Sequence, residues 1–245
     1  MAKKFMVLAH RGYRGKFTEN TLLSFQKGFE FGADGVEFDV QKTKDGQYVI
    51  MHDNSLKRIG NMDKNVEELT LAEVKMVDLP MGQKIPTLEE TLSLIPKDKF
   101  VNIELKEETI TTDDLENIYN LAVKYISLEN LLLSSFNHDL LPFFRKKKVK
   151  IGMLIGERDN KNGILNLFAK IYRMNPEFVN PPIKIYELMG KRIADILVWL
   201  MKFPNRKIAY YTVNTQQQFD SAKTHADVVF SDEVEYALKY RNSIV

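Results

Sequence analysis

The amino-acid sequence predicts an α/β fold, a TIM-type (β/α)8 barrel with a small insertion after its second strand, formed by residues 1–245 as a single domain. Eight short β-type runs alternate with eight helical runs along the chain. Its 245 residues match the roughly 250 of a single barrel of this type. The hydrophobic fraction of 44% and the charged fraction of 28% are ordinary for a globular domain, which excludes disordered and fibrous classes.

The predicted strands are short apolar runs bounded by turn residues. They are Phe5–Ala9, Val36–Gln41, Phe100–Leu105, Leu131–Ser135, Lys150–Leu154, Glu177–Asn180, Lys207–Tyr211 and Asp227–Phe230. The sixth has the weakest pattern because Pro176, Pro181 and Pro182, which cannot donate ladder hydrogen bonds, crowd it.

The predicted helices lie between these strands. They are residues 21–31, 87–95, 112–126, 137–147, 160–173, 185–202, 215–223 and 233–241. Thr87 with Glu90, directly after Pro86, has the spacing of a capping box that starts a helix, and Thr111 with Asp114 repeats that spacing.

Residues 46–84 interrupt the alternation. They contain an extra strand, Tyr48–Met51, and a small helix around Leu71–Val77. Asp45-Gly46 separates the extra strand from Val36–Thr43, and Asp-Gly between two β-type runs is a strong hairpin signal. We interpret residues 46–84 as an insertion into one βα loop. Loops that follow barrel strands carry the active site, so such an insertion can cover it.

The most apolar stretch, Ile185–Phe203, is interrupted by charged residues. Its Leu188, Met189, Ile193, Ile196, Leu197 and Leu200 recur at helical spacing. The spacing predicts an amphipathic helix that packs on the domain, and no transmembrane segment. Because Phe5–Ala9 is too short for a signal peptide, we expect a cytoplasmic protein.

Charge and cysteine content exclude several functions. Lys and Arg number 35 against 33 Asp and Glu, and without a basic stripe there is no support for a nucleic-acid partner. The absence of Cys excludes disulfides, Cys-ligated zinc, iron–sulfur clusters and a thiol nucleophile. Any metal must therefore bind to carboxylates and the four His, which favours hard cations.

Two predicted strands carry acidic residues on one face. Val36, Phe38 and Val40 alternate with Glu37, Asp39 and Gln41, and Val101, Ile103 and Leu105 alternate with Asn102, Glu104 and Lys106. Successive strand side chains point to opposite faces, so in a barrel Glu37, Asp39 and Glu104 point inward. Three inward carboxylates need a compensating cation, and a divalent metal helped by Lys106 is the simplest one. The same alternation also fits antiparallel strands with one solvated face.

Two histidines lie near these acids in the predicted fold. His10 directly follows the first strand and precedes Arg11, and His52 ends the extra strand. A single His at a strand end is usually a hydrogen-bonding or capping residue. Two of them beside Arg11, a carboxylate cluster and a lysine are suited to phosphate-ester chemistry. His138 and His225 fall in predicted helical segments and are given no role.

Several motifs together resemble the glycerophosphodiester phosphodiesterase family. They are Ala9-His10-Arg11-Gly12, Glu19-Asn20-Thr21, residues 32–40, Thr43-Lys44-Asp45-Gly46, His52-Asp53, Leu69-Thr70-Leu71, residues 85–90, Glu104-Leu105-Lys106, Ser134-Ser135-Phe136, Tyr211-Thr212-Val213-Asn214 and Ala226-Asp227. The resemblance spans nearly the whole chain and is thin between about residues 150 and 205. It implies a (β/α)8 barrel with a small segment inserted after the second strand.

The resemblance also implies roles for individual residues. His10 and His52 match the catalytic histidines, Glu37, Asp39 and Glu104 the metal-binding acids, and Arg11 and Lys106 the phosphate-contacting positions. Phe136 and Tyr211 fall at substrate-binding positions, although aromatic residues at strand ends are as often plain packing residues. The implied cofactor is one divalent cation, Mg²⁺ first, with Ca²⁺ or Mn²⁺ as alternatives. Two positions depart from the family pattern: Thr18 replaces a Pro and Tyr211 replaces a Trp.

The expected reaction is metal-dependent hydrolysis of a small glycerophosphodiester to glycerol 3-phosphate and an alcohol, with the two histidines as general acid and base. Direct attack by water and attack by the neighbouring glycerol hydroxyl through a cyclic phosphate both remain open, as does the oligomeric state. One alternative is a phospholipase-like enzyme, for which the basic run Arg145–Lys148 with Lys150 would meet the bilayer. Another is a glycerophosphodiester-binding sensor without turnover.

Overall fold

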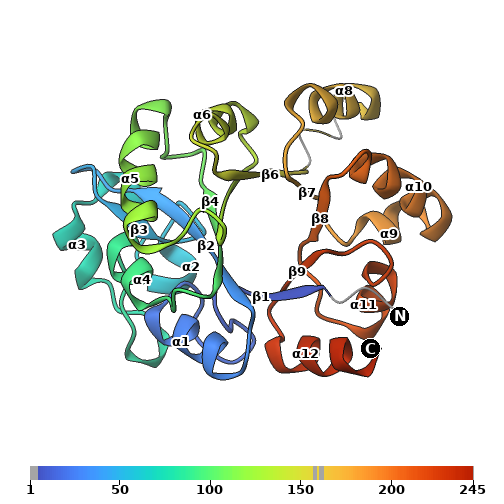
Figure 1. Ribbon diagram of the computed structural model, residues 1–245. Helices are drawn as coiled ribbons and strands as arrows, with labels where there is room; N and C mark the ends of the chain where they lie inside the picture. Colours follow the sequence, from blue (N-terminus) through green and yellow to red (C-terminus); the bar gives the residue numbers. More distant parts are fainter. Residues whose placement is uncertain (1–4, 157–158, 160–162, 245) are drawn as a thin grey trace.

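The structure, a computed structural model, describes residues 5–156, 159 and 163–244. Eight parallel strands form a closed barrel surrounded by helices (Figure 1). Closure is made by β1 (Met6–His10), which pairs in parallel with β2 (Gly35–Lys42) on one side and with β9 (Val228–Ser231) on the other. The predicted fold class is confirmed.

The remaining strands lie close to their predicted positions. They are β3 Tyr48–Ile50, β4 Phe100–Leu105, β5 Leu131–Ser135, β6 Lys150–Leu154, β7 Phe178–Asn180 and β8 Lys207–Tyr210. The proline-crowded strand forms after all as β7, but with only 3 residues. The first strand ends at His10 itself, one residue later than predicted, and β3 ends at Ile50, so His52 follows that strand instead of ending it.

Helices follow the strands on the outside of the barrel (Figure 1). They are α1 Leu22–Glu30, α4 Leu88–Leu94, α5 Leu115–Tyr125, α6 Leu141–Lys146, α8 Ile164–Met174, α9 Ile185–Met189, α10 Lys191–Lys202, α11 Gln216–Ala222 and α12 Val234–Ser243. Both predicted capping boxes, at Thr87 and at Thr111, are present. The helices predicted over 112–126 and 137–147 each begin with a 3₁₀ turn, η3 (Thr112–Asp114) and η4 (His138–Leu140). Residues 160–162 of the helix predicted over 160–173 lie outside the described residues.

The interior of the barrel has an apolar layer and a polar layer. The ladder places Leu8 and Phe100 beside Gly35, and two residues further along it places His10 and Asn102 beside Glu37. Side chains two apart in a strand share a face, so the polar layer follows the apolar one toward the carboxyl ends of the strands. The apolar layer consists of Leu8, Phe100, Leu132, Phe178, Ala209, Val228 and Phe230. It closes one end of the barrel interior and leaves the polar groups at the other.

The segment between β2 and α4 has its own small core. It contains β3, α2 (Lys57–Gly60), η1 (Val66–Glu68), α3 (Leu71–Met76) and η2 (Pro80–Gly82). As the Asp45-Gly46 turn predicts, β3 pairs antiparallel with β2, with Lys42 opposite Tyr48. The core of the segment consists of Val49, Met51, Leu56, Val66, Leu69, Val74, Val77, Leu79 and Ile85. Thr18 Oγ1 donates to the Pro80 carbonyl at 2.9 Å, which ties the segment to the loop after β1.

The helix predicted over 185–202 is wrong in two respects. The backbone breaks at Gly190, where φ is +72°, giving α9 and α10 instead of one helix. The buried residues of α10 are Ala194, Val198 and Met201, while the predicted packing residues Ile193 and Ile196 are 55% and 60% exposed. The helix therefore packs mainly through Ala194, Val198 and Met201, and of the predicted packing residues only Leu197 and Leu200 are half-buried. Among the described residues no helix is both long and apolar enough to cross a membrane.

Candidate active site

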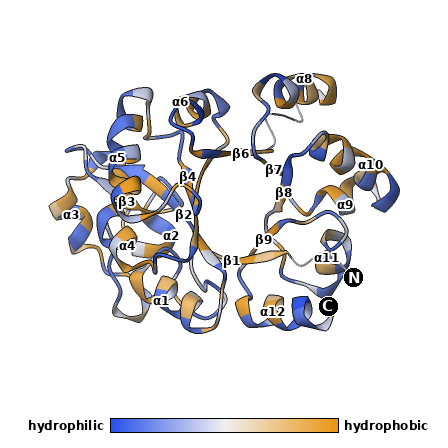
Figure 2. Cartoon of the chain, viewed as in Figure 1, coloured by the Kyte–Doolittle hydropathy of each residue, from blue (hydrophilic) through white to orange (hydrophobic). Residues whose placement is uncertain are grey.

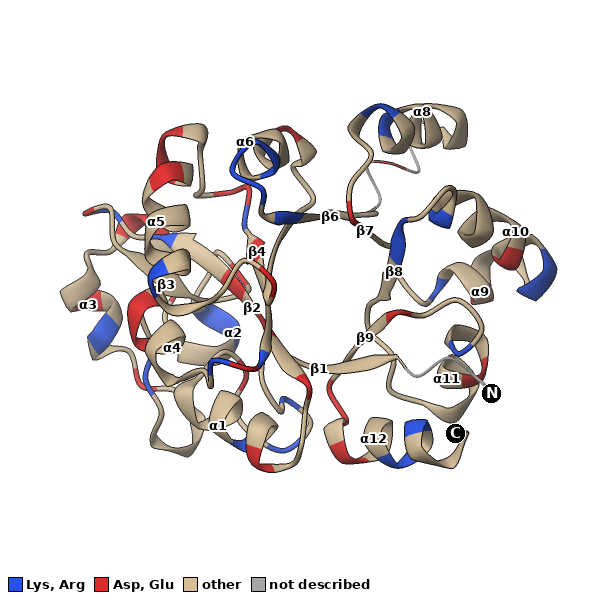
Figure 3. Cartoon of the chain, in the orientation of Figure 1, with Lys and Arg blue, Asp and Glu red and all other residues tan. Residues whose placement is uncertain are grey.

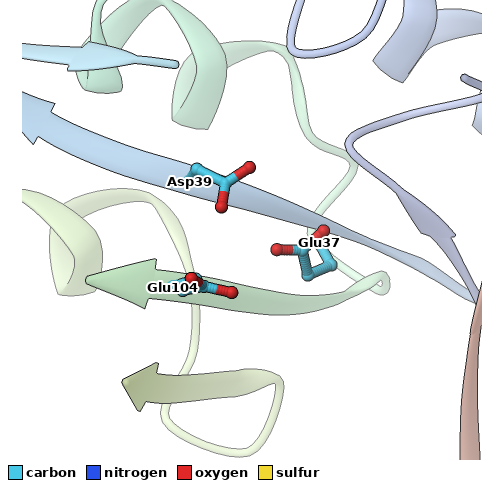
Figure 4. Close-up of side chains that lie close together, drawn as sticks. All are labelled: Glu37, Asp39 and Glu104. Carbon is cyan, nitrogen blue, oxygen red and sulfur yellow. The ribbon is translucent and has the colours of Figure 1, made fainter. Parts of the chain in front are cut away.

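Three carboxylates lie together on the two neighbouring strands β2 and β4 (Figure 4). Glu37 and Asp39 come from β2 and Glu104 from β4, where the ladder places Asp39 directly beside Glu104. One oxygen from each residue lies within 4.8 Å of the others, and all three side chains are buried. The alternation of the two strands therefore brings together the three acids that the sequence indicated, in a group that could hold a metal ion.

Burial and neighbouring charges shift the pKa values of these three acids in different directions. It raises the pKa of Glu37 well above 4.5, and the nearby Asp39 and Glu104 raise it further. Burial also raises the pKa of Glu104. Although burial acts in the same direction on Asp39, Lys106 and Arg11 hold its pKa below the usual value. Asp39 Oδ1 is buried and has no hydrogen-bond partner among the described residues. Crowded carboxylates with such an unpartnered oxygen fit a hard divalent cation.

Lys106 and Arg11 bring positive charge to the three acids. Lys106 Nζ donates to Glu104 Oε1 at 2.9 Å and lies 3.5 Å from Asp39 Oδ1. Burial lowers the pKa of Lys106, but Glu104 and Asp39 more than compensate and raise it. The backbone N–H of Arg11 donates to Glu37 Oε2 at 3.0 Å, and its guanidinium Nε lies 3.5 Å from Asp39 Oδ2. Both predicted cations therefore contact the carboxylate group.

His10 is held by a carboxylate from the last strand of the barrel. Its Nδ1 donates to Asp232 Oδ1 at 2.7 Å, which leaves Nε2 3.9 Å from Glu37 Oε2. Asp232 follows β9 and is fixed in turn by Asn214, whose Nδ2 donates to Asp232 Oδ2 at 2.8 Å. Burial lowers the pKa of His10, and the bond to Asp232 works against that change. The imidazole therefore has a fixed orientation, with Nε2 facing the acids.

His52 has the same arrangement in the segment between β2 and α4. Its Nδ1 donates to Asp53 Oδ1 at 2.6 Å, and Asp53 also accepts a hydrogen bond from the Arg58 guanidinium. Burial lowers the pKa of His52, while Asp39 raises it. Both predicted histidines therefore use Nδ1 on a carboxylate and keep Nε2 free of that bond.

Glu19 connects the loop after β1 to that segment. Its carboxylate accepts from three arginines, at 3.2 Å from Arg11, 2.8 Å from Arg14 and 2.5 Å from Arg58. Arg58 also binds Asp53, which orients His52. The Glu19 carboxylate therefore fixes Arg11 directly and supports Asp53 through Arg58. Burial raises the pKa of Glu19, but the arginines together lower it, so the group stays ionised.

A cavity of about 450 Å³ opens at the carboxyl ends of the strands. Its wall includes His10, His52, Arg11, Glu37 and Glu104, together with the aromatic pair. That pair is Phe136 and Tyr211, whose ring centroids lie 6.0 Å apart in an edge-to-face arrangement. Tyr211 Oη donates to the carbonyl of Ile155 at 2.5 Å, which fixes the ring. The predicted site residues are therefore gathered at one end of the barrel.

The other two histidines lie apart from the acids. His138 starts η4, is buried, and its Nε2 lies 2.8 Å from the carbonyl of Leu154. His225 lies in the turn between α11 and β9, not in a helix, 3.4 Å from Asp195. Both therefore have contacts outside the group of acids.

Comparison with known proteins identifies the family. The model of the glycerophosphoryl diester phosphodiesterase family matches residues 10–236. A glycerophosphodiester phosphodiesterase of Caldanaerobacter subterraneus is 35% identical over 207 residues, covering 80% of this chain and 85% of the relative. The crystal structure of a glycerophosphodiester phosphodiesterase from Thermotoga maritima has a TM-score of 0.84 at 33% identity, covering 98% of this chain and 100% of that one.

The chain belongs to the glycerophosphoryl diester phosphodiesterase family. The predictions of this family and of a phosphoric diester hydrolase are thereby confirmed. A phosphodiesterase from Oleispira antarctica, solved with the product sn-glycerol-3-phosphate, shares the fold, with a TM-score of 0.82 at 24% identity. The alignment covers 97% of this chain and 96% of that one.

Sequence reasoning missed several residues of this phosphodiesterase site. Asp232 and Glu19 received no role, although Asp232 lies two residues after the predicted strand Asp227–Phe230, close to where barrel enzymes place functional groups. Asn20 was also missed: its Nδ2 donates to Asp39 Oδ2 at 2.9 Å. Arg14 and Lys184 add two cations to the cavity wall. Glu19 and Asn20 lie within a motif quoted for the family resemblance, so their position was visible but their contacts were not.

Proposed function

We propose that this protein hydrolyses small glycerophosphodiesters to sn-glycerol 3-phosphate and an alcohol. The observation that carries the proposal is the pair of histidines, each held at Nδ1 by a carboxylate, that line one cavity with a buried group of three acids. The Oleispira antarctica phosphodiesterase holds sn-glycerol-3-phosphate as its product, which supports the same product here. A sensor without turnover has less support, because every polar position of the expected machinery is filled.

Glu37, Asp39 and Glu104 would hold one divalent cation, with Mg²⁺ as the first choice and Ca²⁺ or Mn²⁺ as alternatives. Their all-oxygen donor set suits these hard ions. When bound, the cation neutralises charge on the phosphoryl oxygens of the substrate. The raised pKa of Glu37 supports this assignment, because a carboxylate that is costly to ionise in isolation gains most from a neighbouring positive charge.

Arg11 and Lys106 would bind the phosphodiester. A planar guanidinium matches two phosphoryl oxygens, and the ammonium of Lys106 adds a compact charge beside them. Arg11 lines the cavity, and its Nε makes no hydrogen bond to a described residue, although it lies 3.5 Å from Asp39 Oδ2. The ion pair with Glu19 keeps the Arg11 guanidinium in place.

One histidine would remove a proton from the nucleophile and the other would protonate the leaving alkoxide. Each transfer needs an imidazole nitrogen free of other bonds, and the carboxylates on Nδ1 leave Nε2 available in both residues. Burial lowers the pKa of both His10 and His52, which favours the neutral imidazole that the general base needs. The general acid would start as the imidazolium, with a second proton on Nε2, and give that proton to the leaving alkoxide. The Asp232 and Asp53 carboxylates then stabilise the charged imidazolium.

Phe136 and Tyr211 would form the wall that contacts the alcohol group. Their edge-to-face arrangement presents aromatic surface to the cavity, and such surface suits a quaternary ammonium headgroup. We further propose that residues 1–245 act as one catalytic domain. In it, residues 46–84 form an inserted segment that positions His52 through Asp53 and Arg58.

One assay tests this proposal. Purified protein is given glycerophosphocholine, glycerophosphoethanolamine and glycerophosphoglycerol, and release of sn-glycerol 3-phosphate is followed with EDTA and after restoring Mg²⁺, Ca²⁺ or Mn²⁺. Release that EDTA abolishes and a divalent cation restores is expected. Absence of release from every diester with every cation would overturn the enzymatic proposal, and release unaffected by EDTA would overturn the metal assignment.

A further inference from the structure

Exposed apolar side chains are concentrated in one part of the molecule. Of the fourteen large hydrophobic residues that are exposed in the described part of the chain, nine lie between residues 164 and 203. Six of them, on and directly after α9 and α10, are called the apolar ridge here: Leu188, Met189, Ile193, Ile196, Trp199 and Phe203. Orange segments on the adjacent α8, α9 and α10 show this region in Figure 2. Apolar surface gathered in this way marks a site of interaction.

The ridge arises because α10 has two apolar faces. Ala194, Val198 and Met201 are buried on the face toward the barrel. Ile193, Ile196, Trp199 and Phe203 recur three or four residues apart on the opposite face, and each is more than half exposed. Trp199 and Phe203 pack their rings against each other, with centroids 6.2 Å apart, and neither ring is covered. The outer face of α10 therefore has the composition of a helix that lies at a lipid surface.

The surface continues onto α8. Tyr172 Oη donates to the carbonyl of Leu200 at 3.1 Å, which joins the outer side of α8 to α10. Tyr172 is 42% exposed, and Leu165, on the same face of α8, is 82% exposed. Two helices thus contribute apolar groups to one continuous surface.

Positive charge surrounds the ridge. Residues 164–203 contain six Lys and Arg against three Asp and Glu, whereas the whole chain is nearly balanced. Arg173, Lys184 and Arg192 are exposed and form no ion pair with any described residue. Of the nearby acids, Asp195 is already engaged by Tyr186, Lys191 and His225. Figure 3 shows basic segments in blue on α8 and α10, together with an acidic segment in red on α10. Glu187 on α9 is also exposed without an ion pair to any described residue, so the unpaired charge beside the ridge is three cations against one acid.

The α9 end of the ridge lies near the mouth of the catalytic cavity. Pro182, Ile183 and Lys184 line that cavity, and α9 begins at the following residue, Ile185. From there α10 leads away from the mouth, because Phe203 is followed by β8, which begins at Lys207 at the other end of the barrel. The basic run Arg145–Lys148, considered from the sequence as a lipid contact, precedes β6, and its Lys147 is paired with Glu116 at 2.8 Å.

We infer that the apolar ridge and its flanking cations dock this protein on the surface of an anionic phospholipid bilayer. Apolar side chains enter the boundary between headgroups and acyl chains, and Lys184, Lys191 and Arg192 contact lipid phosphates. A second copy of the chain on the same surface is the competing occupant, and the measurement of oligomeric state below distinguishes it. This inference goes beyond the proposed function. Vesicle binding is measured without substrate, so the docking inference and the proposed hydrolysis can each fail independently.

The single Trp of the chain makes the test specific, because all indole fluorescence comes from position 199. The full chain is titrated with vesicles of phosphatidylcholine alone and with vesicles that also contain phosphatidylglycerol. We expect the emission maximum to move to shorter wavelength, and the protein to co-sediment, with the anionic vesicles. Brominated acyl chains should quench the emission. An unchanged spectrum with no co-sedimentation on anionic vesicles would overturn the inference.

Variants distinguish vesicle binding through the apolar ridge from nonspecific adhesion of the protein to vesicles. Ile193→Ser with Ile196→Ser should weaken vesicle binding about ten-fold or more, because each removes a buried isoleucine from the bound state. Lys191→Glu with Arg192→Glu should weaken binding to anionic vesicles by a similar factor. Met76→Ser, at a 75% exposed residue of α3, is the matched control and should bind normally. All three should hydrolyse soluble diesters as the parent does. Equal loss in the Met76 control, or a stable dimer in sedimentation equilibrium with Trp199 already shielded from acrylamide, would contradict the inference.

Discussion

His10 and Asp232 are 222 residues apart in the sequence and 2.7 Å apart in the structure, joined by a hydrogen bond between Nδ1 and Oδ1. The bond links the first and last strands of the barrel at the point where they close it. Because Asn214 also donates to Asp232, the imidazole is held by a chain of contacts that reaches three strand ends. Asp232 therefore acts as a positioning residue for His10.

Asp232→Asn should lower turnover by about 10²-fold, because the amide cannot stabilise a charged imidazole or fix its orientation in the same way. KM should change little, since Asp232 does not line the cavity floor made by the acids. The acidic limb of the pH–rate profile should move, because the bond to Asp232 raises the pKa of His10. Asp220→Asn, at a surface carboxylate paired with Lys223, is the control. A variant with an unchanged kcat and an unchanged profile would remove Asp232 from this role.

His10→Ala and His52→Ala should each lower kcat by roughly 10²–10⁴-fold, because each removes one proton transfer. The double variant should lose less than the product of the two factors, since both groups serve one reaction. Kinetics on glycerophosphocholine at saturating metal give both numbers. His225→Ala, in a turn away from the cavity, should keep normal turnover. If either active-site variant kept near-normal turnover, the acid–base assignment for that residue would be wrong.

Local sequence pattern was enough to place the three acids and their strands. Glu37 and Asp39 lie two apart in a β-run, and that period alone fixes them on one face, with Val36 and Phe38 packed against the helices. Asp232 and Glu19 could not be assigned in this way. Their roles depend on partners 222 and up to 39 residues away, which no local period encodes.

The prediction of the face through which α10 packs was wrong for a different reason. Helical spacing identifies an apolar stripe but not the surface that the stripe meets. Residues 191–203 carry apolar side chains on two faces, and Ala194, Val198 and Met201 face the barrel. Ile193, Ile196 and Trp199 remain outside. With apolar side chains on both faces, the spacing alone does not select the face that packs.

Gly12→Ala should destabilise the fold by about 2–4 kcal/mol, combining a left-handed backbone with a steric clash. Gly12 has φ +77°, and a Cβ there would lie 2.6 Å from the backbone carbonyl carbon of Ser24. Gly46 has the same φ of +77° with nothing within 4 Å of the added atom. Gly46→Ala should therefore cost only about 1 kcal/mol, from the backbone alone. Urea unfolding of both variants measures the difference, and equal losses would show that the clash with Ser24 is relieved without cost.

Metal binding should strengthen as pH rises through the mildly acidic range. Burial raises the pKa of Glu37 and of Glu104 in the metal-free protein, so protons compete with the cation for these oxygens. A carboxyl whose pKa is raised in the folded protein stabilises the metal-free fold fully at pH values below 4.5, its pKa in the unfolded chain. This stabilisation is lost as the pH rises through the raised pKa of the folded protein. The ionised acids that remain above that pKa are the form that binds metal. The increase in Tm on adding Mg²⁺ should therefore be larger at about pH 8 than at about pH 5.

Glu37→Gln tests the origin of this dependence. The amide cannot be ionised, so the metal-free variant should lose part of the stability change between the two pH values. Its affinity for Mg²⁺ should fall about 10-fold or more, because a charged ligand is replaced by a neutral one. Glu89→Gln, at an exposed carboxylate on α4 paired with Lys124, should bind Mg²⁺ as the parent does. Thermal unfolding and calorimetric titration across pH give both quantities. A parent-like metal affinity in Glu37→Gln would show that the cation is held without Glu37, and a Tm increase independent of pH would show that protons do not compete for the site.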